Sequence, residues 1–406
     1  MAKIDDSVKK KVPELRFPGF TDDWEERKLG ELTTSFSGGT PSAGNSSYYK
    51  GDIPFIRSGE INSDKTELFL TEAGLKSSSA KMVSVGDILY ALYGATSGEV
   101  GISQINGAIN QAILAIKPCD GYNSHFLMQW LKLKKQKIID QYLQGGQGNL
   151  SGSIVKNLVL KVPNFEEQKK IGAFFKQLDD TITLHQRKLD LLKEQKKGYL
   201  QKMFPKNGAK VPELRFAGFA DDWEERKFKD ILKTHSFRSY LADGSDDGKY
   251  EVIQQGNNPI VGYSDGEPFT DYKDITLFGD HTVSLYNPQS PFFIATDGVK
   301  ILSADNFEGD YLYTTLERYK PAPQGYKRHF TILKNKDLCF TRNVEEQKQI
   351  GSFFKQLDNT ITLHQRKLDK LNLLKQGYLQ QLFPQNDEKV PRVRFANFKN
   401  ERSEER

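Results

Sequence analysis

Residues 164–205 read NFEEQKKIGAFFKQLDDTITLHQRKLDLLKEQKKGYLQKMFP, and residues 343–384 repeat this stretch with 31 of 42 positions identical. Asn164 opens the first copy and two glutamates follow it, a pattern typical of a capped helix N-terminus. Pro205 closes the copy, because proline cannot continue a helix. We therefore expect one long helix in each copy.

Both predicted helices carry their apolar residues at alternating steps of four and three, which is typical of a coiled-coil seam. A helix of about 38 residues is about 57 Å long. Two such helices in one chain bury their seams best against each other, and two directional copies favour an antiparallel pair with pseudo-two-fold symmetry. The first seam comprises Ile171, Phe175, Leu178, Ile182, His185, Leu189, Leu192, Lys196, Tyr199 and Met203, and the second comprises Ile350, Phe354, Leu357, Ile361, His364, Leu368, Leu371, Lys375, Tyr378 and Leu382.

Polar residues interrupt both seams at matching positions. His185 corresponds to His364, and Lys196 corresponds to Lys375. One interpretation of the histidines is a metal site or a pH switch, because histidine binds metals and titrates near neutral pH. The other is that polar seam residues fix the register of the helix pair. Recurrence at matched positions favours the register interpretation.

A second repeat, which we call the frame motif, precedes each half. The sequence KVPELRFPGFTDDWEERKL at 11–29 returns at 210–228 with 16 of 19 positions identical, and a partial copy, KVPRVRFANF, closes the chain at 389–398. Large aromatic residues recur in it, and we expect them to pack in hydrophobic cores rather than to contact DNA. They are Phe17, Trp24, Phe216 and Trp223.

Between frame motif and long helix lie two variable stretches without evident kinship, 33–160 and 232–341. Short apolar runs alternate in them with glycine-bounded turns, and residues 125–143 predict a helix. We therefore predict an α/β (α+β) protein in which a repeated scaffold presents two different recognition surfaces. The predicted parts are 1–163, the first frame and domain; 164–205, the central helix; 206–342, the second frame and domain; 343–384, the second helix; and 385–406, a tail with the partial frame.

Composition sets broad limits on function. The 406 residues include 58 Lys and Arg against 53 Asp and Glu, a net charge of +5, which permits a polyanionic partner without requiring one. Two cysteines cannot supply a disulfide scaffold or a four-thiolate zinc site. The sequence has no apolar run of membrane-spanning length and no apolar signal segment at its start, so we expect a cytoplasmic protein without a membrane partner.

Loops of both variable stretches are rich in side chains that suit hydrogen bonding to base edges and phosphates. The same composition suits other polar ligands, and an ordinary turn or surface role is the alternative for each residue. The DNA-contact candidates are Thr40, Ser42, Arg57, Tyr93, Thr96, Gln144, Gln147, Asn149 and Ser151 in the first stretch, and Gln254, Gln255, Asn257, Tyr263, His281, Lys300, Lys327, Arg328 and His329 in the second.

Common catalytic motifs are absent from the sequence. It contains no GxxxxGK[ST] phosphate loop, no HExxH zinc motif and no metal-spaced cysteine pair. The run Asn287-Pro288-Gln289-Ser290 starts like the Asn-Pro-Pro-aromatic tetrad of amino-methyltransferases but departs from it at the third position. We therefore expect no catalytic residue, metal ligand or cofactor site in this chain.

The chain resembles the specificity subunits of type I restriction-modification enzymes over nearly its whole length. The resemblance rests on VPELRFPGFTDDWEERKLGEL (12–32), GDIPFIRSGEI (51–61), NQAILAI (110–116), the two FEEQKKIGAFFKQLD-type helices and their GYLQ-x-x-FP endings. It implies that each variable stretch is a target recognition domain reading one half of a split double-stranded DNA site, and that the helices set the unread spacer.

The resemblance also implies partners. Two methyltransferase subunits would bind S-adenosylmethionine, and two optional motor-nuclease subunits would use ATP and magnesium. Two other classes stay open from the residues alone. One is a stand-alone bipartite DNA-binding regulator, which should bind its operator tightly by itself. The other is a coiled-coil adaptor presenting two protein-binding domains, which should show no salt-dependent affinity for DNA.

Overall fold

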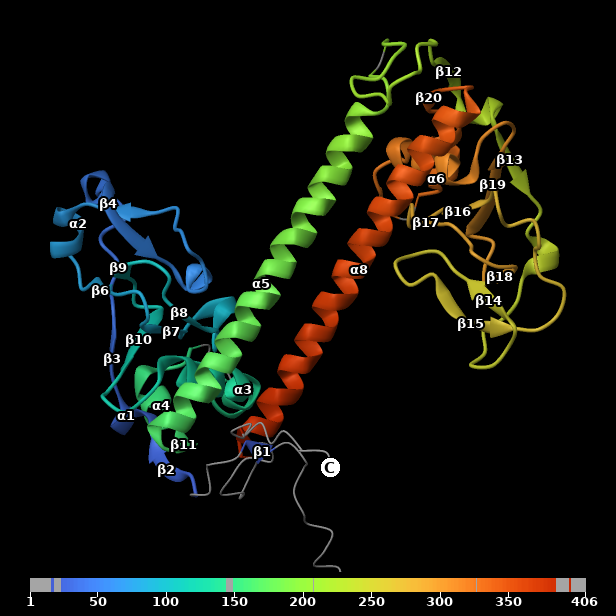
Figure 1. The fold of residues 1–406 in the computed structure, drawn as a ribbon. Helices are drawn as coiled ribbons and strands as arrows, with labels where there is room; N and C mark the ends of the chain where they lie inside the picture. Colours follow the sequence, from blue (N-terminus) through green and yellow to red (C-terminus); the bar gives the residue numbers. More distant parts are fainter. Residues whose placement is uncertain are drawn as a thin grey trace, which may run out of the picture. The chain divides into compact units, whose positions relative to one another are not determined.

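A computed structural model describes residues 23–143, 149–206, 208–325 and 327–384, together with two short strands at 16–17 and 394–395 (Figure 1). The chain divides into two compact units. Unit 1 comprises Met1–Leu184 and Asp369–Arg406, and unit 2 comprises His185–Leu368. Each unit therefore contains one variable stretch and a part of each long helix.

The repeated stretches form the two long helices, α5 (Phe165–Lys202) and α8 (Val344–Leu382), as the sequence predicts. Asn164 caps α5, because its side-chain oxygen accepts a hydrogen bond from the amide of Glu167 at 3.0 Å. Asn343 caps α8 in the same way, accepting from two amides of the first turn. The caps satisfy N–H groups that have no partner within the helix.

The two helices run antiparallel within each unit. In unit 1 the ring centroids of Phe174 and Tyr378 are 5.0 Å apart, and in unit 2 those of Tyr199 and Phe353 are 5.1 Å apart. These are the same two positions of the repeat, so one contact occurs twice and the predicted antiparallel pair is confirmed. Apolar seam residues are buried on both helices, namely Ile171, Phe175, Leu178, Leu189, Leu192, Met203, Ile350, Phe354, Leu368 and Leu382.

Unit 1 is built on two four-stranded sheets (Figure 1). The first has the order β3-β10-β7-β8 and is antiparallel, whereas the second has the order β5-β4-β9-β6, with β4 and β9 parallel. The strands are β3 (Thr33–Ser37), β4 (Tyr49–Ile56), β5 (Phe69–Leu70), β6 (Lys81–Val83), β7 (Ile88–Ala91), β8 (Val100–Ile102), β9 (Gly107–Ile109) and β10 (Ile113–Pro118). The helices are α1 (Leu29–Leu32), α2 (Glu72–Lys76), α3 (Ser124–Tyr142) and α4 (Gly152–Lys156).

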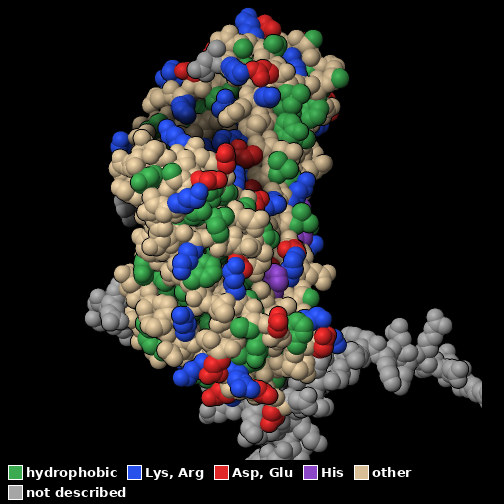
Figure 2. Space-filling view, turned by 90° about the vertical axis from the view of Figure 1, so that its left-hand side faces the viewer, with side chains coloured by type: hydrophobic (Ala, Val, Ile, Leu, Met, Phe, Trp, Pro, Cys, Tyr) green, Lys and Arg blue, Asp and Glu red, His purple; other side chains and the backbone are tan. Residues whose placement is uncertain are grey.

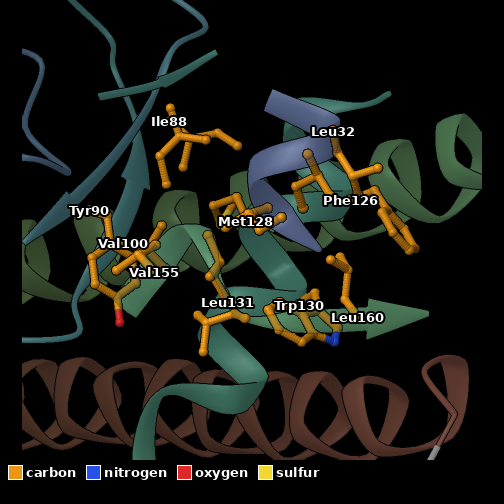
Figure 3. Packing of buried hydrophobic residues seen from close by; sticks show 14 of the residues in the cluster. Leu32, Ile88, Tyr90, Val100, Phe126, Met128, Trp130, Leu131, Val155 and Leu160 are labelled. Carbon is orange, nitrogen blue, oxygen red and sulfur yellow. The ribbon is translucent and has the colours of Figure 1, made fainter. Parts of the chain in front are cut away.

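Alternation along β7 places this strand between two hydrophobic cores. Ile88 and Tyr90 point into one core, and Leu89 and Ala91 point into the other. Figure 3 shows the first core, in which α3 contributes Phe126, Met128, Trp130 and Leu131 opposite the sheet residues Ile88, Tyr90 and Val100. The first sheet is thus covered on both faces, which explains why β7 and most of β10 read as unbroken apolar runs.

Unit 2 repeats this architecture with fewer strands. Its antiparallel sheet has the order β13-β19-β16-β17, and a three-stranded sheet has the order β15-β14-β18, with β14 and β18 parallel. The strands are β13 (Leu232–His235), β14 (Tyr250–Ile253), β15 (Ile260–Ser264), β16 (Thr276–Gly279), β17 (Leu285–Tyr286), β18 (Phe292–Ile294) and β19 (Val299–Ala304). The helices are α6 (Gly309–Tyr319) and α7 (His329–Lys334).

The two variable stretches therefore share one topology although their sequences show no evident kinship. Strand β3 corresponds to β13, β10 to β19, β7 to β16 and β8 to β17 in the antiparallel sheets. In the mixed sheets β4 corresponds to β14, and its parallel neighbour β9 corresponds to β18. Helices α3 and α6 follow the last sheet strand in both units. The predicted fold class is confirmed in both halves.

The frame motif supports each domain at its base. In unit 1, β2 (Glu25–Lys28) pairs antiparallel with β11 (Val159–Val162), and in unit 2, β12 (Glu224–Lys227) pairs antiparallel with β20 (Asp337–Phe340). The preceding tryptophans, Trp24 and Trp223, are each 4 % exposed, and Phe216 packs against the unit 2 core, as predicted. The side chain of Phe17 lies outside the described residues.

Two further contacts connect copies of the frame motif to the units. In unit 1, β1 (Arg16–Phe17) of the first copy pairs parallel with β21 (Arg394–Phe395) of the third copy, with equivalent residues opposite each other. In unit 2, Arg215 of the second copy binds the fully buried carboxylate of Glu346 through two hydrogen bonds of 2.7 and 2.9 Å. Residues 394–395 of the C-terminal partial motif thus belong to unit 1, beside residues 16–17 of the N-terminal copy.

Candidate nucleic-acid interface

In unit 1 the turn after β7 meets the segment before α4. The amide of Leu92 donates to the carbonyl of Ala112 at 2.8 Å, and the Leu92 carbonyl accepts from the amide of Leu150 at 2.9 Å. The next residue, Tyr93, forms an isolated antiparallel bridge with Asn149. We call residues 92–93 and 149–150 junction 1. Backbone hydrogen bonds hold it, so its side chains are free to vary.

Unit 2 contains the same two backbone hydrogen bonds, between the residue after β16 and the start of α7. The amide of Asp280 donates to the carbonyl of Gly298 at 2.8 Å, and the Asp280 carbonyl accepts from the amide of His329 at 2.8 Å. By these hydrogen bonds Asp280 corresponds to Leu92, and His329 corresponds to Leu150. We call residues 280–281 and 328–329 junction 2, in which His281 and Arg328 stand at the positions of Tyr93 and Asn149.

Different buried side-chain contacts support the two junctions. Leu92 is buried in the hydrophobic core of unit 1. Asp280 is also buried, but its carboxylate accepts a hydrogen bond from the amide of Phe330 at 2.9 Å. His329 is fully buried, with Nδ1 3.0 Å from the Asp280 carbonyl and Nε2 accepting from the amide of Gln324 at 2.9 Å. The structure gives this DNA-contact candidate an internal role.

The side chains next to these backbone contacts differ in exposure. Asn149 and Arg328 are exposed, whereas Tyr93 and His281 are half-buried and the Nδ1 atom of His281 lies in the interior. The amide of His281 donates to Oε1 of Gln255 at 2.9 Å, which brings a further candidate to junction 2. The structure thus assembles predicted residues that lie far apart in the sequence, and it does so at the same topological position in both units.

Other candidates of unit 1 lie at or away from junction 1. The Thr96 hydroxyl lies 3.4 Å from the Tyr93 carbonyl, and Ser151 caps α4 by accepting from the amide of Ile154 at 3.2 Å. Thr40 donates to Gln111 at 2.7 Å, and Ser42 is exposed. Gln144 and Gln147 lie outside the described residues, in the segment that precedes Asn149.

Arg57 is engaged within unit 1. Its guanidinium donates to Glu60 at 2.6 Å and to Glu67 at 2.9 Å. Burial acts to raise the pKa of Glu60, but hydrogen bonds from Arg57 and Thr66 outweigh it and lower this pKa to about 2. A DNA phosphate would therefore have to compete with two carboxylates for this arginine.

The remaining candidates of unit 2 surround the β14–β15 turn and the start of β19. The Gln254 side chain donates to the carbonyl of Asn258 at 3.0 Å, and Asn257 and Tyr263 are exposed. Lys300 donates to the carbonyl of Asp297 at 2.6 Å. Lys327, next to junction 2, donates to Gln324 at 3.1 Å.

No large single-sign patch marks the face drawn in Figure 2, which is the side on which the domain of unit 1 lies in Figure 1. Lys and Arg side chains are scattered over it among Asp and Glu, and most of the surface is uncharged side chain and backbone. This distribution agrees with the near balance of 58 basic and 53 acidic residues.

The polar seam residues form ion pairs within each unit. In unit 2 the Lys196 ammonium donates to Asp358 at 2.6 Å and to Glu317 of α6 at 2.7 Å. In unit 1 the equivalent lysine, Lys375, pairs with Asp179 at 2.5 Å. These contacts join the helix pair and, in unit 2, attach the variable domain to it, which supports the register interpretation of the lysines.

His185 and His364 lie beside each other in unit 2, with ring centroids 5.6 Å apart. Partial desolvation lowers the pKa of His185, and the neighbouring charges of Lys367 and His364 act in the same direction. Within the residues that the structure describes, no group of three or more His, Cys, Asp and Glu side chains is placed to hold a metal ion. The role of the two histidines therefore stays a prediction.

Sequence reasoning missed the residues that brace the candidates. Gln111, Glu60 and Asp280 hold Thr40, Arg57 and junction 2, respectively. The one local signal was a polar residue within or beside an apolar run, as in NQAILAI and in LFGDHTV. Their partners lie up to 71 positions away, so the sequence does not disclose them.

Comparison with known proteins agrees with this architecture. The family model described as "Type I restriction modification DNA specificity domain" matches residues 21–194 and 220–373. The MjaIX type I restriction enzyme specificity subunit of Methanocaldococcus jannaschii is 29 % identical over 183 residues, which cover 42 % of this chain and 41 % of that protein. The MjaVIII specificity subunit of the same organism is 22 % identical over 231 residues, covering 56 % of this chain and 52 % of that protein. The chain thus spans about half the length of these relatives.

A solved structure extends the likeness to the whole fold. The crystal structure of the type I restriction-modification S subunit from M. genitalium aligns with a TM-score of 0.68 at 17 % identity, covering 93 % of this chain and all of that one. Among the described residues, we find no helix with the length and hydrophobicity that a membrane span requires. The two family matches include both variable stretches and most of both long helices, and on this basis the chain belongs to the family of type I restriction-modification DNA specificity subunits.

Proposed function

We propose that this chain reads an asymmetric, two-part site in double-stranded DNA and directs adenine methylation and restriction by partner subunits. Each variable domain would read one half-site through the major groove. One observation carries the proposal: two domains of unlike sequence share one topology on near-identical helices. Two copies of one recognition domain would favour a palindromic site, whereas two unlike domains favour two different half-sites.

The long helices would set the length of the unread spacer. Their seams are buried and the same aromatic contact recurs in both units, so the pair is a regular structure whose length depends on residue number. A heptad added to both helices preserves the seam and lengthens the pair by about 10 Å. At 3.4 Å per base pair this corresponds to about three base pairs of spacer.

The chemistry would reside in the partners. Two methyltransferase subunits would bind S-adenosylmethionine, and two optional motor-nuclease subunits would use ATP and magnesium. The role of this chain would then be to position the partners on DNA and not to supply catalytic residues. The family relationship supports this assignment.

The first test is to map N6-methyladenine across the genome of the host and of a strain that lacks this gene. We expect one split motif with a fixed gap to disappear in the deletion strain. An unchanged map would overturn the proposal and favour a stand-alone DNA-binding regulator. Tight, salt-dependent binding of the isolated chain to one operator would then identify the regulator.

Two engineered chains separate the roles of domains and helices. Replacement of residues 33–160 by another variable stretch should change one half-site only. Insertion of one heptad after Lys188 and one after its equivalent, Lys367, should lengthen the spacer by about three base pairs and preserve both half-sites. Insertion of two residues at the same places is the control, because it turns the following part of each seam by about 200° away from the partner helix and should abolish methylation.

A further inference from the structure

We infer that junctions 1 and 2 set the base specificity of the two half-sites, through Tyr93 and Asn149 in unit 1 and through His281 and Arg328 in unit 2. The inference rests on the proposed function and deepens it, because it names which side chains of each domain read bases. It starts from the correspondence between the two junctions, which neither the family match nor the sequence provides.

Both junctions share two backbone hydrogen bonds although their residues differ. In each unit the residue after the inner strand, Leu92 or Asp280, forms two backbone hydrogen bonds of 2.8 to 2.9 Å. One joins it to the residue just before the neighbouring strand, and the other joins it to a residue at or shortly before the start of a short helix. The side chains of Leu92 and Asp280 are buried. The positions of the outward side chains are therefore fixed by atoms that every residue type except proline supplies.

The outward side chains differ in chemistry between the junctions. Tyr93 and Asn149 offer a phenol and a carboxamide, whereas His281 and Arg328 offer an imidazole and a guanidinium. If the backbone contacts stay constant while the polar side chains vary, a DNA-recognition domain can change its base specificity and keep its fold. Buried contacts beneath each junction preorganise it, so little conformational entropy is lost on binding.

The chemistry of these side chains predicts base classes. A carboxamide such as that of Asn149 forms paired hydrogen bonds with the N6 and N7 edge of adenine, and a guanidinium such as that of Arg328 does so with O6 and N7 of guanine. We therefore expect an A·T pair in the half-site read by unit 1 and a G·C pair in the half-site read by unit 2. Among the described residues, neither side chain forms a salt bridge or a hydrogen bond, whereas Arg57 is paired with two carboxylates.

The test maps the methylation motif of the complete complex in the host for the wild-type chain and for Asn149→Ala and Arg328→Gln. We expect Asn149→Ala to relax one A·T position in one half-site and Arg328→Gln to relax one G·C position in the other, each by roughly ten- to one-hundred-fold in discrimination. Arg226→Gln, on frame strand β12, is the matched control and should leave the motif unchanged.

The outcomes separate the inference from the proposed function. If the wild-type chain yields no split motif, the proposed function fails and the inference fails with it. If the wild-type chain yields a split motif and both junction variants methylate the same motif at wild-type levels, the inference alone is overturned. If a variant loses methylation, its melting temperature distinguishes a recognition role from a folding role. An unchanged melting temperature supports a role of the residue in base recognition. A lowered melting temperature assigns the residue to folding and overturns its recognition role.

Discussion

The Lys196 ammonium lies 2.6 Å from the Asp358 carboxylate, and the two residues come from different long helices. The lysine side chain is only 12 % exposed, and Glu317 of the variable domain is a second partner. Burial raises the pKa of Asp358, whereas the nearby Lys196 lowers it. Asn123 caps α3 and Glu308 caps α6, and their amides donate to the equivalent residues Gln168 and Gln347. Nine residues after these caps stand Lys132 in unit 1 and Glu317 in unit 2, so the two units carry opposite charges at one position.

Replacement of the seam lysine should destabilise unit 2 strongly. In Lys196→Met the carboxylates of Asp358 and Glu317 lose their shared cation while they stay largely buried. We expect the free energy of unfolding, measured in urea, to fall by about 3–5 kcal/mol. Lys197→Met is the matched control, because Lys197 is 66 % exposed, and should change stability by less than about 0.5 kcal/mol. Equal effects of the two substitutions would refute the role of the ion pair.

Reversal of the charge at Lys132 should stabilise unit 1. Burial lowers the pKa of Lys132, and the neighbouring Lys375 lowers it further. In Lys132→Glu a carboxylate would approach the Lys375 ammonium as Glu317 approaches that of Lys196. We expect a gain of about 1 kcal/mol in unfolding free energy, and a loss for the converse change Glu317→Lys. A loss in both variants would show that charge does not govern this contact.

The ion pair at Glu60 predicts a dependence on pH. The pKa of Glu60 is lowered to about 2 from an ordinary value of 4.5, so the charged form is favoured in the folded chain. Its stabilisation is therefore complete above pH 4.5 and is lost as the pH falls from 4.5 to about 2. In thermal unfolding, Glu60→Gln should melt below the wild type at pH 7, and the difference should shrink at pH 3.

Glu67→Gln is the control for this measurement. The Glu67 side chain also contacts Arg57 but is 84 % exposed, so its removal should lower the melting temperature little at either pH. A constant gap between the wild type and Glu60→Gln from pH 7 to pH 3 would contradict the assignment.

Two buried tyrosines should respond in opposite ways to loss of the hydroxyl group. Among the described residues, the Tyr90 hydroxyl has no hydrogen-bond partner, and burial raises its pKa to about 12. Tyr90→Phe should therefore leave stability unchanged or raise it by about 1 kcal/mol. The Tyr311 hydroxyl accepts from the amide of Thr341 at 3.2 Å, and Tyr311→Phe should cost about 1–3 kcal/mol because that buried amide is left unpaired. Urea unfolding of both variants measures the change in unfolding free energy. An equal loss in Tyr90→Phe and Tyr311→Phe would contradict the predicted difference between the two hydroxyl groups.

The features that the sequence predicts are those set by neighbouring residues. The bounds of α5 and α8, the Asn164 cap and the buried seam follow from local spacing and cap chemistry, and the burial of Trp24 follows from its place in a repeated motif. A helix can be read in this way because its hydrogen bonds connect residues four positions apart.

The shared sheet topology could not be predicted in the same way. Strands such as β16 and β17 have four and two residues, and their pairing depends on partners far away in the sequence. The ion pair of Lys196 with Glu317 spans 121 positions, and the burial of His329 depends on Asp280, 49 positions away. Lys196 and His329 are both polar, and only the folded chain shows that their side chains are engaged inside unit 2.

The pairing of the frame strands bears on how such a chain changes over evolutionary time. Lys28 lies opposite Val159 in unit 1, and Lys227 lies opposite Asp337 in unit 2. In each unit the chain therefore leaves the frame strand and returns to pair with it at adjacent positions, about 5 Å apart. A replacement cassette needs only ends that fit this gap, because its length and internal sequence place no strain on the strands that hold it. A lineage can thus exchange one whole variable domain in a single genetic event, while the repeated scaffold keeps its sequence.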